Sequence, residues 1–490
     1  MIVDQFGNPA QSRRFNRSAG NSIDRPWVPT KLDDIGNLIT EYERRTLVAV
    51  SRLLVENWAP AKAIVRQIPM YSVGNAWKPT FETKDADSKM EAETIIREQF
   101  CRMADIKGRS FAATLKHLSR MRLRDGDVYY LLTETRSGFP AVQIIPGHRI
   151  GQRDRGETHV AKGKYRGKRI EEGVISDRWG RVVAYRLLGA TEKDDTEISS
   201  ASLKHVSKSD YPEGSRGYPD LAHGLNDGRD ALQAHEWERL KMLAVSAHTL
   251  IEHNETGAAN SDPRNHFEDD GSTKLASGNA GEIETGTVHG GIYKTVRAGS
   301  GYKLEALEHK TPGETWESYQ NRLARKLGAG VPWPLSFYWE ANGPGGGVAE
   351  RRDIMQARKT VEEEQTVLAP HARTIIGYAF KKLVKLGRVE DSPDWWRWSF
   401  SMPPKLTVDD GRVSKAMLEM WRAGVVSDED LLDEMGKDHD EFYRNKFRRA
   451  VVKEQLFEEA QEGEGVELDS RYKGMFTPND TPDDEDSTDD

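Results

Sequence analysis

The chain has 490 residues, of which 37% are hydrophobic and 31% charged, and its formal net charge is −8. This length allows two or three ordinary domains or one extended subunit, and the high share of charge favours the extended form. The single cysteine, Cys101, excludes a disulfide framework and a cysteine-rich zinc module. No apolar run approaches the ~18–20 residues that a membrane-spanning helix needs, so we expect no membrane partner.

The negative charge is concentrated at the C-terminus. Residues 458–490 contain thirteen acidic residues and only two basic ones, which leaves the other residues close to neutral. Such a composition is typical of segments that do not form a packed core. We therefore expect a disordered acidic tail, and we expect no broad basic surface elsewhere.

The first part of the chain is predicted to be helical. After a polar arm over 1–34, apolar residues recur at helical spacing from about Asp33 to Trp58, and Pro60 interrupts the pattern. Further helices are predicted over 89–104 and 110–124. Cys101 falls in one of these helical stretches and is expected to be a buried apolar residue.

A β-rich region follows. Residues 128–134 and 141–145 predict one hairpin, and residues 173–176 and 182–186 predict a second one whose turn contains Gly180, a residue that tolerates positive φ. A short strand is predicted over 203–206. Together these elements predict an α+β domain with an antiparallel sheet.

The rest of the chain is mainly helical. A helix over 219–253 precedes a Gly- and Asp-rich stretch with short strands, and a helix over 314–327 ends at Gly328. After an aromatic and Gly-rich loop, the pattern of a 39-residue helix runs over 348–386, which would span roughly 58 Å. Pro370 and Gly377 should kink this helix. Several short helices are then predicted over 409–462.

Four segments in this order resemble the lambda-type portal proteins of tailed bacteriophages, and the resemblance covers about residues 35–455. They are the helix, Asp-Gly-Asp and strand of Arg120–Tyr130 with the Pro-x-x-Arg-Ile turn at Pro146–Ile150; the hairpin Gly173–Tyr185; the Arg-Gly segment Ser215–Ala222; and the helix, loop and long helix of Trp316–Leu386, followed by Asp409, Lys415 and Arg422–Ser427. The loop before the long helix departs from the family: a Gly-rich stretch, Asn342–Gly347, stands where the family has an Asn-Tyr-Ser-Ser-like run.

The resemblance implies an elongated α+β portal subunit with an α/β wing, a two-helix stem, a small clip, a tunnel loop, a long kinked helix and a helical crown. It divides this chain into an N-terminal arm at 1–34, the wing at 35–218, a stem helix at 219–253, the clip at 254–311, a second stem helix at 312–330, the tunnel loop at 331–347, the long helix and wing return at 348–408, the crown at 409–462 and the acidic tail at 463–490.

The function that the resemblance implies is non-enzymatic. Portal proteins form a ring of about twelve copies at one capsid vertex, through which double-stranded DNA enters and leaves. The implied partners are other copies of the chain, DNA, the large terminase subunit, head–tail adaptor proteins and the major capsid protein. The implied location is the virion, after assembly in the host cytoplasm. Two alternatives stay open: another head-completion or tail structural protein, and a phage nuclease or protease.

The resemblance places the channel at the tunnel loop and the start of the long helix. The residues expected near DNA are Lys326, Trp339, Asn342, Arg351, Arg352, Arg358 and Lys359. A ring repeats each cation once per copy, so few basic side chains per chain suffice for contact with phosphates while the DNA still slides. The alternative is that these cations form ion pairs between subunits or face solvent.

Two groups of aromatic residues stand out near this region. Trp333, Phe337, Tyr338 and Trp339 either wall the channel or pack the base of the loop against a neighbouring subunit. Trp395, Trp396 and Trp398 alternate with charged residues and are expected to fill the wing core or an interface.

Signs of enzymatic chemistry are absent from the sequence pattern. The Gly-rich stretch at 342–347 lacks the Gly-Lys-Ser/Thr of a P-loop, and no second histidine follows His235-Glu236 at zincin spacing. His205, His223 and His235 are scattered and are expected to lie on the surface or pack against helices. Asp125 and Asp127 are a candidate carboxylate pair, but Gly126 between them more simply predicts a helix end in the left-handed region. We expect no catalytic residue, no metal site and no cofactor.

Overall fold

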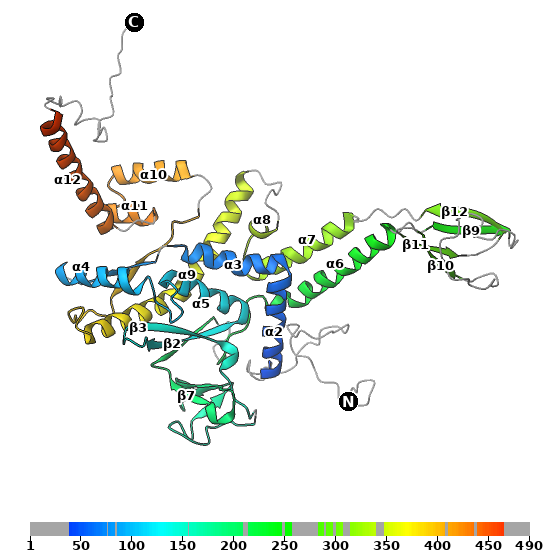
Figure 1. Ribbon diagram of the computed structural model, residues 1–490, viewed down its shortest axis with the longest axis horizontal. Coiled ribbons are helices and arrows are strands. Elements are labelled where there is room, and N and C mark those ends of the chain that lie inside the picture. The colour runs from blue at the N-terminus through cyan, green and yellow to red at the C-terminus, as the bar shows by residue number, and fades with distance from the viewer. Residues whose placement is uncertain are drawn as a thin grey trace, which may run out of the picture. The chain divides into compact units, whose positions relative to one another are not determined.

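The computed structural model describes residues 39–75, 77–83, 86–154, 156–208, 214–246, 250–256, 283–288, 291–296, 300–306, 314–339, 347–406, 410–435 and 439–464 (Figure 1). The chain divides into two compact units, Met1–Val408 and Asp409–Asp490. The predicted arm at 1–34, most of the predicted acidic tail and the candidate Asn342 lie outside the described residues.

The first helices differ in their bounds from the prediction. Helix α2 spans Glu41–Asn57 and begins at Thr40, which forms a capping box with Glu43. The predicted helix start at about Asp33 lies outside the described residues. The predicted interruption at Pro60 is confirmed: α2 ends at Asn57, and Pro60 occupies the first turn of the next helix, α3 (Ala59–Val73), where its missing N–H costs no hydrogen bond.

The next helices lead into the sheet. Helix α4 (Ala86–Ile95) continues as a π-helical turn at Ile96–Phe100, and α5 spans Phe111–Asp125. Gly126 ends α5 with φ of 89°, which confirms the predicted left-handed stop. Cys101 follows the π-helical turn and is only partly buried against the core, so the prediction of a buried helical residue is confirmed in part; burial raises the pKa of its thiol to about 12.

Both predicted hairpins and the predicted strand are confirmed. The first sheet has the order β3-β2-β8, and the second has the order β4-β5-β6-β7, with all neighbours antiparallel. Gly180, in the turn between β5 and β6, has φ of 79°. The strands are β2 (Asp127–Glu134), β3 (Pro140–Pro146), β4 (Arg169–Glu171), β5 (Val174–Ser176), β6 (Val182–Leu187), β7 (Thr196–Ser199) and β8 (Leu203–Ser207).

The first sheet is buried on both faces. Because successive side chains of a strand point to opposite faces, Val128 and Tyr130 pack with α5 and α9, whereas Tyr129 packs with Val174 and Tyr185 of the second sheet. Figure 1 shows α5 and α9 on the same side of β2 and β3. These strands therefore form the centre of the first unit.

Helix α9 spans Gly347–Lys385, within one residue of its predicted bounds. It is helical through Pro370 and Gly377, and a kink at either residue stays a prediction. Its second half is anchored to the first sheet, where the hydroxyl of Tyr378 donates to the carbonyl of Thr133 at 2.8 Å and Tyr130 contacts His371 at 3.1 Å. The buried residues of this half of α9 are Leu368, Ala372, Ile375, Ile376, Ala379, Phe380 and Leu383.

The chain returns to the same core after α9. Strand β13 (Trp398–Ser401) pairs antiparallel with β1 (Lys78–Phe81), and the rings of Trp398 and Phe81 stack at 4.6 Å. The prediction of a core position is confirmed for Trp398. Trp395 and Trp396 are exposed in this chain, so an interface role for them stays a prediction.

Helices α6 and α7 lie side by side (Figure 1). Helix α6 spans Leu225–Ser246 and α7 spans Glu314–Gly330, and the ring of His235 stacks on that of Trp316. The predicted extension of the first helix to His253 is wrong. Leu250–Thr256 is instead strand β9, because its backbone pairs antiparallel with β12 (Ser300–Ala306), and such long-range pairing overrides a local helical pattern.

The predicted short strands in this region are confirmed. Strand β10 (Ile283–Val288) pairs antiparallel with β11 (Gly291–Val296).

The second unit contains the short helices that the sequence predicts. They are α10 (Asp410–Arg422), α11 (Asp428–Glu434) and α12 (His439–Glu464). Asp428 joins all three, because it accepts hydrogen bonds from the indole of Trp421 and from the hydroxyl of Tyr443.

Candidate functional site

Aromatic side chains and close packing fix the segment that follows α7. Helix α8 (Leu335–Tyr338) packs on α7, where the hydroxyl of Tyr338 donates to the carbonyl of Ala324 at 2.7 Å. A Cβ at Gly328 would lie 2.1 Å from that hydroxyl, so glycine is required for this approach. Gly328 serves this contact and does not end the helix, since α7 continues to Gly330, three residues beyond its predicted last residue.

Trp333 is the anchor of this segment. Its side chain is 2% exposed, its indole donates to the amide oxygen of Gln67 at 3.0 Å, and its ring contacts those of Tyr71 and Phe337. The Gln67 amide in turn donates to the carbonyl of Phe337 at 2.6 Å. Trp333 therefore packs within its own chain, and both expected roles, a channel wall and a contact with a neighbouring subunit, are wrong for this residue.

The same segment is tied to the start of α9. The hydroxyl of Thr360 donates to the carbonyl of Pro332 at 2.8 Å, and the hydroxyl of Ser336 donates to the carboxylate of Asp353 at 2.7 Å. The base of the loop and the first turns of α9 thus form one bonded group, and a displacement of the loop base has to move α9 or break these bonds.

The structure separates the predicted cations into two groups. Lys326 forms an ion pair with Asp227 at 3.0 Å, and Arg358 forms one with Glu362 at 2.9 Å on the next turn of α9. Arg351, Arg352 and Lys359 are exposed and form no ion pair with any described residue.

Two observations bear on the remaining candidates. Arg352 and Lys359 are seven residues apart and lie on one face of α9, with the exposed Met355 between them. Trp339 is 39% exposed, and its indole donates to the amide oxygen of Asn321 on α7. The described end of the loop therefore carries an exposed indole, and the start of α9 carries cations that have no ion-pair partner among the described residues.

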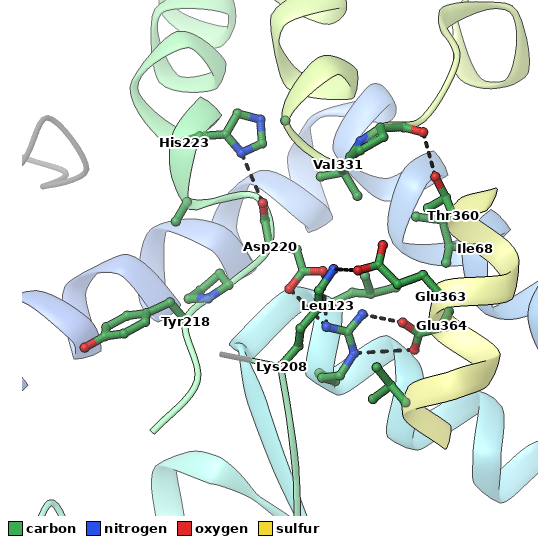
Figure 2. A pocket seen from close by; sticks show the side chains of 16 residues that line it. Ile68, Leu123, Lys208, Tyr218, Asp220, His223, Val331, Thr360, Glu363 and Glu364 are labelled. Atoms are coloured by element: carbon green, nitrogen blue, oxygen red, sulfur yellow. Dashed lines mark hydrogen bonds and ion pairs between the residues drawn. The ribbon is translucent and has the colours of Figure 1, made fainter. Parts of the chain in front are cut away.

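A polar cavity of about 510 Å³ lies beside this segment (Figure 2). Residues from several separate parts of the chain line it: 218–223 before α6, 330–332 at the end of α7, 360–367 of α9, Ile68 of α3, Arg122 and Leu123 of α5, and Lys208. Arg122 of α5 is buried at its wall and binds Glu364 of α9 and Asp220, the latter at 3.2 Å. This guanidinium links α5, α9 and the segment that leads into α6.

The charges around Arg122 are compensated within the wall. Burial lowers the pKa of the Arg122 guanidinium, but Asp220 and Glu364 outweigh this effect and raise it above its usual range. Burial raises the pKa of Asp220, against the opposing effect of Arg122. At the mouth, Lys208 pairs with Glu363 at 2.7 Å (Figure 2). A buried arginine shared by two carboxylates fixes the geometry where three segments meet.

A second buried arginine joins the segments that carry the resemblance. Arg216 binds the carboxylate of Asp127, and its guanidinium also donates to the carbonyls of Gly147 at 2.7 Å, Glu172 at 2.8 Å and Ile150 at 3.0 Å. Asp127 belongs to the Asp-Gly-Asp turn, and Gly147 and Ile150 belong to the Pro-x-x-Arg-Ile turn. Arg216 of the Arg-Gly segment thus joins the Asp-Gly-Asp turn, the Pro-x-x-Arg-Ile turn and Glu172, the residue just before the hairpin Gly173–Tyr185.

Glycines allow this close convergence. A Cβ at Gly217 would lie 2.1 Å from the carbonyl oxygen of Gly126, and a Cβ at Gly147 would lie 2.0 Å from the carboxylate of Asp127. Gly217 and Gly147 are needed because the Gly126 backbone and the Asp127 carboxylate lie too close at the junction to leave room for a Cβ.

The structure assigns the two aspartates of the turn to separate ion pairs. Asp125 binds Arg52 at 2.7 Å and Arg124 at 2.8 Å, whereas Asp127 binds Arg216. Burial alone would raise the pKa of Asp127, but Arg216 and His205 hold it well below its usual range. The acidic pair therefore has a structural arrangement: two guanidinium groups hold the Asp125 carboxylate and a third holds that of Asp127.

His205 is neither on the surface nor packed against a helix, so that prediction is wrong. It lies on β8, stacks on Tyr129 at 4.4 Å and faces Asp127 at 3.5 Å, and burial lowers its pKa. Strand pairing with β2 carries it into the junction. His223 and His235 do contact helices, through the carbonyl of Leu327 and the ring of Trp316.

Sequence reasoning missed Arg122, Glu364 and Arg216 as organising residues. Arg216 was visible only as part of the Arg-Gly motif, and its partner Asp127 lies 89 residues away. Arg122 and Glu364 lie 242 residues apart, so spacing could not reveal their pairing. Among the described residues, no group of three His, Cys, Asp or Glu side chains is placed to hold a metal ion, and no helix is long and apolar enough to cross a membrane.

Comparison with known proteins identifies a family whose sequence model matches this chain. The sequence model described as Phage portal protein, lambda family, matches residues 26–338. None of the curated proteins matches the chain.

The solved structures that are similar include two particle necks and one virion. The neck of an empty gene transfer agent particle computed with C6 symmetry has a TM-score of 0.47 at 11% identity, covering 80% of this chain and 94% of that one. The neck of the native particle computed with C12 symmetry has a TM-score of 0.46 at 11% identity, with the same coverage. The virion of the native particle has a TM-score of 0.46 at 9% identity, covering 80% of this chain and 93% of that one.

Proposed function

Because the chain belongs to the lambda family of phage portal proteins, we propose that it assembles into a ring of about twelve copies at one vertex of a capsid. Double-stranded DNA passes through this ring during packaging and ejection. The observation that carries the proposal is the family match over residues 26–338. On this proposal the chain acts as a structural protein, is assembled in the host cytoplasm and is then part of the virion.

The segments take the roles that the family implies. The helices and strands around β2 and α5 form the wing, and α6 and α7 form the stem. The strands β9 to β12 form the clip, which docks the large terminase subunit during packaging and head–tail adaptor proteins afterwards. The second unit forms the crown, and the outer surface of the ring contacts the major capsid protein. In the sequence, α6 precedes the clip strands and α7 follows them, and in space the two helices pack side by side. This arrangement supports these roles.

The contact with DNA is made by the loop and the start of α9. Arg351, Arg352 and Lys359 are the strongest candidates because they are exposed and unpaired with described residues. Lys326 and Arg358 contribute less, since each already has a carboxylate partner. Trp339 and Asn342 complete the set at the loop. Few cations per chain suit a conduit, because neutralising many phosphates would hold the duplex in place.

Electron microscopy of the purified protein tests the assembly. The proposal predicts rings with a central hole wide enough for duplex DNA. Particles the size of a single chain at every concentration would contradict it.

The DNA contact has its own test. The double variant Arg351→Ser and Arg352→Ser should weaken binding of a short duplex to the assembled protein and flatten its salt dependence, because each lost phosphate contact lowers the slope by about one. The matched control replaces Arg166 and Lys168, two exposed cations of a surface loop, with Ser. If the two double variants weaken DNA binding equally, the proposal that α9 contacts DNA is wrong. The proposal of ring assembly is not affected by that result.

A further inference from the structure

Helix α12 is exposed around its whole circumference in its middle part. All ten residues from Arg444 to Lys453 are exposed, and they include Phe447, whose side chain is 68% exposed, and Val451 at 56%. Among the described residues, the first turns of the helix are attached to α11 through the hydrogen bond from Tyr443 to Asp428 at 2.6 Å. Large apolar side chains that stay in water on an otherwise bare helix indicate a surface that a partner covers.

Four of the exposed residues form one face of mixed character. Arg444, Phe447, Arg448 and Val451 follow the spacing i, i+3, i+4 and i+7, which places them on one side of the helix. Arg444 and Arg448 form no ion pair with any described residue. This face therefore offers two unpaired guanidinium groups beside two apolar anchors.

The chemistry that fits this face is an acidic segment with apolar residues of its own. The chain contains such a segment directly after α12. Residues 475–490 begin with Met475 and Phe476 and then carry seven acidic residues and no basic one. Guanidinium groups bind carboxylates in paired geometry, and the apolar side chains at the start of the segment match Phe447 and Val451.

The chain is long enough to make this contact within one copy. Ten residues separate the end of α12 at Glu464 from Met475, and they can span about 33 Å when extended. The helix from Val451 to Glu464 rises by only about 20 Å. The segment therefore reaches back to Val451 and, continuing along the helix, to Arg448 and Arg444.

We infer that the Arg444, Phe447, Arg448 and Val451 face of α12 is a binding site for the acidic C-terminal segment 475–490 of the same chain. The segment covers the apolar side chains and neutralises the guanidinium groups. It thereby withdraws the exposed basic stretch 444–453 of α12 from polyanions, including any DNA that this protein meets. This inference does not depend on the ring or on the channel assignment.

A fluorescent peptide of residues 474–490 tests the site. It should bind the chain truncated after Gly474, and the full chain should bind it at least fivefold more weakly at every protein concentration, because its own segment competes. Raising the salt from 50 to 300 mM should weaken binding by about tenfold, as expected for exposed charges. Equal binding to the full and truncated chains would overturn the inference.

Variants separate the face from general electrostatics. Arg444→Glu with Arg448→Glu in the truncated chain should lower peptide affinity at least tenfold, whereas the control Arg166→Glu with Lys168→Glu should change it less than twofold. A peptide with Met475→Ser and Phe476→Ser keeps all its acidic residues and should bind several-fold more weakly. Circular dichroism of each variant checks that the helices are retained.

Two other occupants would give different results. If a second copy covers α12, the Arg444 and Arg448 variant changes the assembly mass and leaves peptide binding unaltered, which overturns the inference. If DNA is the occupant, a duplex binds the full and truncated chains equally through this face and the peptide does not displace it, which also overturns it.

Discussion

Replacing Arg216 with Met should destabilise the first unit severely. The side chains of Arg216 and Asp127 are each 1% exposed, and the guanidinium also serves three backbone carbonyls at 2.7 to 3.0 Å. Methionine fills much of the volume but leaves the Asp127 carboxylate buried without its guanidinium. Breaking a buried pair in this way costs about 3–5 kcal/mol. The lost carbonyl partners add to this cost, although the contributions are not additive.

Urea denaturation at pH 7, followed by tryptophan fluorescence, measures the effect. The double variant Asp127→Asn with Arg216→Met should lose about 1–3 kcal/mol less than the two single variants together, because no buried charge remains. The matched control Arg358→Met breaks the exposed pair with Glu362 and should cost less than about 1 kcal/mol. A cost below about 1 kcal/mol for Arg216→Met would refute the assignment of Arg216 as the organising residue.

The same pair predicts a pH dependence. The pKa of Asp127 is depressed in the folded chain, so its contribution to stability is fully present above its unfolded pKa of about 4 and is lost as the pH falls below that value. Arg216→Met should lose this acid-sensitive part. An unchanged stability profile below pH 4 would contradict the pairing.

Three further predictions follow from single residues. Gly217→Ala places a Cβ 2.1 Å from the Gly126 carbonyl oxygen and should lower stability by about 1–3 kcal/mol in the same urea assay; no change would mean that the junction can relax. His371, whose pKa burial lowers to about 4, should make the chain less stable by on the order of 3 kcal/mol as the pH falls from about 6.5 to 4, and His371→Gln should abolish that part of the pH profile. Trp333→Ala should cost about 3–5 kcal/mol through the cavity it leaves, and Trp333→Phe less, with the Gln67 oxygen left unpaired; thermal melting of both variants checks the order.

Local patterns predicted the elements whose formation depends on nearby residues. The strands β2 and β3, the turn at Gly180 and the 39-residue helix α9 follow from periodicity and turn chemistry, and the structure has them at nearly the predicted bounds. Gly126 as a helix stop is also a local property, because only glycine takes that φ without strain.

Pairings between distant residues could not be predicted. Strand β9 has a pattern compatible with a helix, and only its partner β12 makes it a strand. The ion pairs of Arg122 and Arg216 span 242 and 89 residues, and the sequence does not say which carboxylate faces which guanidinium. The aromatic run at 333–339 shows the same limit. Its residues are alike in the sequence, but Trp333 is buried against Gln67 whereas Trp339 is exposed.

The mass of the assembled protein tests the central claim most directly. Native mass spectrometry of the purified full chain should show a closed assembly of about 660 kDa, which corresponds to about twelve copies of the 55.3 kDa chain. One ring number or a narrow set of neighbouring numbers would agree with a ring-forming portal protein. A mass of 55.3 kDa at all concentrations, or an open series of masses with no preferred size, would contradict it.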